Sequence, residues 1–184
     1  MKYNYSFPDT LGSKYKTLFG SENQNVLIFS AFVFLIPIIL GHAQNFPMQL
    51  IVGSLVNALL AGSALYVSFK KSLPIILLPV IAALVSGVIF GPFTLFLVYL
   101  VPFIWIGNAI FVYAIKNLKV LNSMHYIPSV FAAALFKAGF LFATTFALIT
   151  FGLVPEIMLV PMSVIQFATA SIGGLLAGTT LLIK

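Results

Sequence analysis

A single lysine interrupts one of the long apolar runs of the chain. Residues 132–142 read AAALFKAGFLF, in which only Lys137 is neither small nor apolar. The residue lies about ten positions into a long apolar run, so at 1.5 Å per residue it is roughly 15 Å deep, near the mid-plane of a bilayer. An ammonium at that depth costs roughly 2.5–3.5 kcal/mol on insertion scales. Lys137 therefore needs a compensating group.

The sequence offers Lys137 no permanent countercharge. The three acids are Asp9, Glu22 and Glu156, and all lie outside the interiors of the apolar runs. Three explanations remain open. The amine loses its proton, it bonds helix carbonyls and side-chain amides, or its partner is an exchangeable anion. The third explanation predicts a carboxylate- or phosphate-bearing ligand, whereas the simplest alternative is a lysine satisfied by carbonyls and water in a cavity.

Amide side chains from three other apolar runs lie within the same apolar environment. They are Gln49, Asn57, Asn108 and Gln166. Each amide alone is typical of helix–helix hydrogen bonding in membranes. Together with Lys137, they indicate the lining of a polar pocket that binds a small molecule.

Trp105, the only tryptophan, lies one helical turn before Asn108. A tryptophan in the middle of an apolar run either packs in the core or stacks on a ring of a ligand. We include it with Lys137, Asn108, Gln166, Asn57 and Gln49 in the predicted binding site.

Few residues of the chain could act in catalysis or bind a metal. The chain has no cysteine, and its two histidines, His42 and His125, are expected on opposite sides of the membrane. No histidine or acid falls in the middle of an apolar run, so general acid–base catalysis has almost no candidate besides Lys137. We therefore expect no metal, no cofactor and no enzymatic activity.

The composition is typical of an integral membrane protein. Of the 184 residues, 61% are hydrophobic and 7% are charged, whereas about a quarter of a soluble domain is charged. Residues 1–24 predict a cytoplasmic arm on the headgroup surface, and residues 25–184 a single transmembrane domain. Apolar runs of bilayer length predict an all-α six-transmembrane-helix bundle, with spans at about 26–41, 48–69, 73–90, 93–115, 127–150 and 158–183.

The lysines predict the orientation of these spans. The connections expected outside, at 41–47, 91–92 and 151–157, contain no lysine. Every lysine except Lys137 falls on the other side, which the positive-inside rule assigns to the cytoplasm. Both termini are then cytoplasmic. Because the lysines mark topology, the net charge of +6 does not require a nucleic-acid partner.

Small residues recur at four-residue spacing along three of the predicted helices. Such ridges allow close helix packing, and an exposed ridge can also dock another membrane protein. Both readings stay open for the ridges Ser54–Ala58–Gly62, Ala83–Gly87 and Ala170–Gly174–Gly178.

The architecture and several motifs resemble the S components, the substrate-binding membrane subunits, of energy-coupling factor (ECF) transporters. The motifs are FGP (90–92), PFIWIGN (102–108), QFATASIGGLLAG (166–178) and Q-x₇-N-A-L from Gln49 to Leu59, the last similar to a poorly characterised branch of the group. The resemblance implies a multi-pass protein of a prokaryotic plasma membrane that captures a scarce, vitamin-like micronutrient from outside. It also implies docking on a pair of ATPases and a coupling membrane protein.

We therefore expect a substrate-capture subunit, surrounded by lipid, that binds a small and anionic solute. The alternative is a self-sufficient secondary transporter or channel. The chain has no span-buried acid for proton coupling, and no span shows a clear pair of broken half-helices. Both absences favour the first hypothesis over the second.

Overall fold

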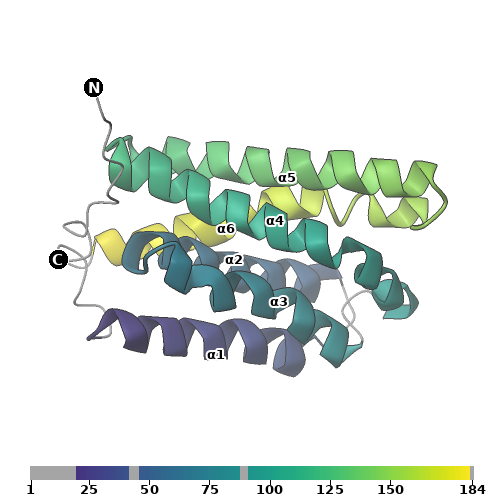
Figure 1. The fold of residues 1–184 in the computed structure, drawn as a ribbon, viewed down its shortest axis with the longest axis horizontal. Coiled ribbons are helices and arrows are strands. Elements are labelled where there is room, and N and C mark those ends of the chain that lie inside the picture. Colours follow the sequence, from purple (N-terminus) through teal and green to yellow (C-terminus); the bar gives the residue numbers. More distant parts are fainter. Residues whose placement is uncertain (1–19, 42–45, 88–90, 183–184) are drawn as a thin grey trace.

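The computed structural model describes residues 20–41, 46–87 and 91–182, and this part of the chain is helical without a strand (Figure 1). The prediction of an all-α fold is confirmed. Short helical turns η2 (Lys70–Ser72), η3 (Gly91–Phe96), η4 (Lys116–Leu121), η5 (Glu156–Met158) and η6 (Thr179–Leu181) flank the longer helices. The longer helices are α1 (Glu22–Leu40), α2 (Phe46–Tyr66), α3 (Leu73–Ser86), α4 (Leu97–Ile115), α5 (Tyr126–Thr150) and α6 (Val164–Gly178).

Five helices of the described part are long and apolar enough to cross a membrane, which indicates a multi-pass membrane protein. The exception is α3, whose 14 residues extend about 21 Å, against a hydrocarbon core of about 30 Å. The prediction of six spans is therefore not confirmed. Helix α6 also begins six residues later than the predicted run at 158, because Pro161 has no amide hydrogen and disfavours helix at the residue before it.

Helix ends and bends follow from identifiable residues. The side chain of Ser21 accepts a hydrogen bond from the amide of Gln24, whose own side chain returns a bond to Ser21, so a capping box starts α1. Helix α3 ends at Gly87, which has a φ of 68°, a conformation that glycine adopts without strain. Prolines lie inside α1 and α3, at Pro37 and Pro79, where each removes one backbone hydrogen bond.

The closest packing of the bundle joins α2 to α6, while α1 packs on α3 and α4 packs on α5. A Cβ atom added to Gly173 would clash with the backbone carbonyl of Ser54, and one added to Gly174 would clash with Val130 of α5. The small residues of α2 and α6 thus serve helix packing inside the molecule, the first of the two readings that their spacing left open.

Charged and polar contacts tie together one end of the bundle. Lys71 lies 2.7 Å from the carboxylate of Glu22, so the start of α1 is joined to η2. The ammonium of Lys116 donates to the carbonyls of Ala64 and Val67, at 3.0 and 2.8 Å, and satisfies the C-terminal end of α2. The predicted inner lysines in the described part, at 70–71, 116 and 119, therefore belong to a common end of the molecule, which we call the lysine end.

Buried apolar side chains form two clusters. The first includes Phe29, Leu60 and Phe111 and lies towards the lysine end. The second includes Leu97 and Met162 and lies towards the opposite end of the bundle. There the segment between α5 and α6 packs on α4. The side chain of Lys137 lies near the junction, because its ammonium sits 5.5 Å from the centre of the Phe111 ring.

Candidate functional site: a cationic pocket between the helices

Lys137 is buried in the bundle and does not reach lipid. Only 2% of its surface is exposed, and its Nζ donates to Oδ1 of Asn57 on α2 at 2.7 Å. The Phe111 ring at 5.5 Å adds a cation–π contact. In residues 20–41, 46–87 and 91–182 the ammonium has no carboxylate partner, since the one ion pair there joins Lys71 to Glu22.

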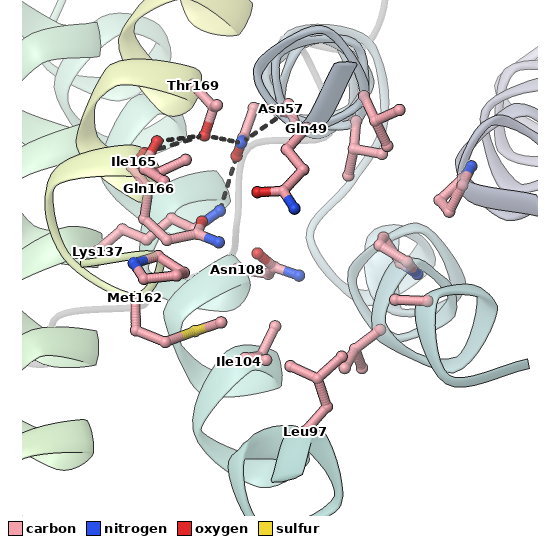
Figure 2. Close-up of a pocket in the computed structure, with 18 residues that line it drawn as sticks. Gln49, Asn57, Leu97, Ile104, Asn108, Lys137, Met162, Ile165, Gln166 and Thr169 are labelled. Carbon is pink, nitrogen blue, oxygen red and sulfur yellow. Dashed lines mark hydrogen bonds between the residues drawn. The ribbon is translucent and has the colours of Figure 1, made fainter. Parts of the chain in front are cut away.

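The bond from Lys137 is held in place by hydrogen bonds of Asn57. Nδ2 of Asn57 donates to the carbonyl of Gly53 at 2.9 Å and to Oγ1 of Thr169 at 3.2 Å. The Thr169 hydroxyl in turn donates to the carbonyl of Ile165 at 2.8 Å. These bonds fix the carboxamide with its oxygen towards the amine, so Asn57 positions Lys137 and links α5, α2 and α6 (Figure 2).

The ammonium borders a cavity of about 110 Å³. This is several times the roughly 10–15 Å³ that one water molecule needs, so a small solute fits. All six long helices contribute to its wall. The lining residues are Pro37, Gln49, Val52, Gly53, Val56, Asn57, Pro79, Val80, Ala83, Leu97, Ile104, Asn108, Lys137, Pro161, Met162, Ile165, Gln166 and Thr169.

The cavity lies towards the end of the bundle that is opposite the lysine end. It is lined by the first half of α2, the second half of α3 and the beginnings of α4 and α6. Lys71 and Lys116, by contrast, follow the last turn of α2 and of α4. The cavity is therefore nearer to the end of the bundle that faces away from these lysines.

Five of the predicted site residues converge on this cavity. Figure 2 shows Gln49, Asn57, Asn108 and Gln166 gathered around the end of the Lys137 side chain. Their amides come from three helices, α2, α4 and α6, as the sequence pattern indicated.

Trp105 does not line the cavity. Of the two roles that the sequence left open, packing in the core fits its contact with the second apolar cluster. Its indole Nε1 donates to the backbone carbonyl of Leu77 at 3.0 Å. Asn108, one turn further along α4, donates from Nδ2 to the carbonyl of Ile76 at 3.1 Å. Both side chains thus join α4 to α3 beside Pro79, but only Asn108 also reaches the cavity.

The segment before α6 contributes lining residues that the sequence pattern did not identify. Met162 is 1% exposed, and with Pro161 it forms part of the cavity wall. Met158 and Met162, four residues apart, both pack in the second apolar cluster. That spacing does not distinguish a segment that closes a cavity, because it is equally typical of the membrane-spanning helix that was predicted from residue 158.

Two further points concern the predicted outer loop at 41–47 and metal binding. His42, Gln44 and Asn45, in the predicted first outer loop, lie outside the described residues. Three or more His, Cys, Asp or Glu side chains grouped as a metal site would require are not found in the ranges that the structure describes.

The arrangement places a buried amine and uncharged amides around a small cavity. The remaining wall of that cavity is aliphatic. A buried cation without a paired anion is costly in a low-dielectric environment. A bound anion would remove that cost.

Comparisons with known proteins do not identify the chain. No family description, curated protein or solved structure matches it. The features that bear on function are therefore the pocket, its charge and its position in the bundle.

Proposed function

We propose that the chain is the substrate-capture subunit of an ECF-type importer and binds a small anionic solute in the cavity beside Lys137. The observation that supports this proposal is the buried ammonium, which has one hydrogen bond to Asn57, no carboxylate in the described part of the chain, and an adjoining cavity. The solute carries a carboxylate or a phosphate, whose charge replaces the missing countercharge.

The position of the cavity supports capture from outside a prokaryotic plasma membrane. The positive-inside rule assigns the lysine end to the cytoplasm, and the cavity lies towards the opposite end. In the proposed topology six spans cross the membrane with both termini in the cytoplasm. Helix α3, at 14 residues, is the shortest of these spans and needs a locally thinner bilayer or flanking turns to complete it.

The proposed partners are a pair of ATPases and a coupling membrane protein. The sequence has no Walker motif, so a nucleotide-driven cycle needs ATPase subunits on other chains. In this proposal the chain itself is not an enzyme: it binds the solute, and the partners supply the work.

A self-sufficient secondary transporter is the second candidate. The observation that favours it is the presence of Pro37 and Pro79 inside two helices that border the cavity. Each proline removes one backbone hydrogen bond from an otherwise continuous helix, and helix breaks around a mid-membrane site are a recurrent feature of carriers. Uphill uptake of the solute by liposomes that contain only this chain would establish the carrier and exclude the capture subunit.

Purified protein in detergent tests the proposed function directly. Native mass spectrometry of the protein as isolated from cells should reveal a bound small anion. We expect Lys137→Met to lose that species and to weaken binding by at least about tenfold, because the anion then has no cation to pair with. Lys119→Met, at the lysine end, is the matched control and should bind as the unaltered protein does. Equal binding by Lys137→Met would return Lys137 to a structural role.

A further inference from the structure

The orientation of the Asn108 amide extends the proposed function to the class of solute, and this extension rests on that function. Asn108 is 3% exposed and lines the same cavity as Lys137. Its Nδ2 is engaged by the backbone carbonyl of Ile76 at 3.1 Å. A carboxamide has one nitrogen and one oxygen, so this bond fixes which of the two faces the cavity.

The atom left to the cavity is the oxygen. In Figure 2 the oxygen of Asn108 points towards Gln166 and the end of Lys137, while the nitrogen points away towards α3. In the part of the chain that the structure describes, this oxygen accepts no hydrogen bond from the protein. Other protein atoms do not fully cover this oxygen either. Asn108 therefore offers a solute an acceptor.

Lys137 and Asn108 favour different groups on one small solute, an anionic acceptor at Lys137 and a hydrogen-bond donor at Asn108. The ammonium has only donors and a positive charge, whereas the Asn108 oxygen can only accept. A cavity of about 110 Å³ brings both demands within the reach of a solute with few heavy atoms. A simple anion would satisfy Lys137 but leave a buried acceptor unpaired, which lowers affinity.

The rest of the cavity wall favours a solute with an aliphatic body. Apart from its polar groups, the wall consists of valines, alanine, glycine, leucine, isoleucines, methionine and prolines. Aromatic side chains do not contribute to this lining within the described residues, and Trp105 is held against α3. The wall thus offers aliphatic contact and no platform for a stacked ring.

We infer that the solute is a small aliphatic anion that also carries a hydroxyl or N–H group, with the anionic group at Lys137 and the hydrogen-bond donor at Asn108. Asn108 distinguishes an acid that carries a hydroxyl or an amide N–H from its plain parent. The gain comes from pairing a buried acceptor that the parent leaves unsatisfied.

Matched pairs of probes test this inference on the full chain in detergent. Isothermal titration calorimetry would compare butanoate with 2-, 3- and 4-hydroxybutanoate, and propyl phosphate with glycerol 3-phosphate. The positional isomers sample different spacings between the anion and the donor, and the two series separate carboxylate from phosphate. We expect at least one hydroxylated probe to bind about tenfold or more tightly than its parent.

Two variants test whether Asn108 causes the preference for hydroxylated probes. Asn108→Leu keeps the bulk of the side chain and should reduce the hydroxyl preference to near unity while the plain parent still binds. Asn108→Asp retains an acceptor and serves as a second variant if the leucine protein unfolds; its added negative charge should weaken both members of a pair, yet keep the preference.

The outcomes separate this inference from the function on which it depends. If plain and hydroxylated probes bind equally and Lys137→Met abolishes both, the anion site stands and the role of Asn108 is refuted. The same holds if the preference survives in Asn108→Leu. If no probe of either series binds, or if Lys137→Met binds as tightly as the unaltered protein, the proposed function fails and this inference fails with it.

Discussion

Replacing Asn57 with aspartate would give Lys137 an internal partner and so compete with any bound anion. Oδ1 of Asn57 already lies 2.7 Å from Nζ of Lys137. Asn57→Asp places a carboxylate oxygen at that position with almost no change in shape. The ammonium then has a permanent countercharge, and an incoming carboxylate or phosphate meets a neutral pair with a second negative charge beside it.

The separation of the two atoms sets the size of the effect. At 2.7 Å and an effective dielectric constant of about 20, opposite unit charges attract by roughly 6 kcal/mol. Desolvation of the new carboxylate cancels part of this attraction. If only a quarter of it opposes ligand binding, affinity falls about tenfold, since about 1.4 kcal/mol corresponds to a factor of ten.

Two readouts are needed, namely the dissociation constant and the melting temperature of the protein in detergent. The calorimetric probe is whichever hydroxybutanoate or phosphate ester binds the unaltered protein most tightly. For Asn57→Asp we expect binding to fall at least about tenfold. Its melting temperature should fall less than that of Asn57→Ala, because both variants lose the bonds that Nδ2 donates to Gly53 and Thr169 but only the aspartate gives Lys137 a countercharge. Asn57→Ala is the control: it loses the bonds to Gly53 and Thr169 without neutralising Lys137, so its stability should fall more and its affinity less.

The opposite ranking would refute the reasoning. If Asn57→Asp binds the probe as tightly as the unaltered protein, the anion is not paired with Lys137. If Asn57→Asp unfolds while Asn57→Ala is stable, the amine is not charged in the folded protein, because a neutral amine would leave the new carboxylate without a counterion.

Three further predictions concern packing and the ends of the helices. Gly173→Ala should lower the melting temperature, at a cost of about 1–3 kcal/mol, since its Cβ would clash with the α2 backbone; Gly139→Ala, where the same atom meets nothing within 4 Å, should be neutral or stabilising. Trp105→Phe should lose its bond to α3 and about 1 kcal/mol of stability with unchanged affinity, whereas a drop in affinity would place the indole at the solute. Lys116→Met should lower the melting temperature by unpairing two carbonyls at the end of α2, and an unchanged value would show that solvent replaces the amine there.

The class of the fold and most of the polar lining could be predicted from the order of the residues alone. Apolar runs of bilayer length require helices, because a backbone in lipid must satisfy its own hydrogen bonds. The depth of Lys137 and the absence of a nearby acid in the sequence indicated an internal polar site. The amides at 49, 57, 108 and 166 followed because polar groups in apolar runs avoid lipid and turn inward.

The partner that each of these groups takes, by contrast, depends on the folded arrangement of the helices. Spacing along one helix cannot show that the Asn57 oxygen accepts from Lys137, that the Asn108 nitrogen donates to the carbonyl of Ile76, or that Trp105 faces α3. Those choices depend on how α2, α4 and α6 cross, and on contacts between residues far apart in the chain. The sequence did not predict that Pro161 and Met162 line the cavity, for the same reason. An apolar segment has the same composition whether it faces lipid or closes a cavity, and only its packing against α4 distinguishes the two.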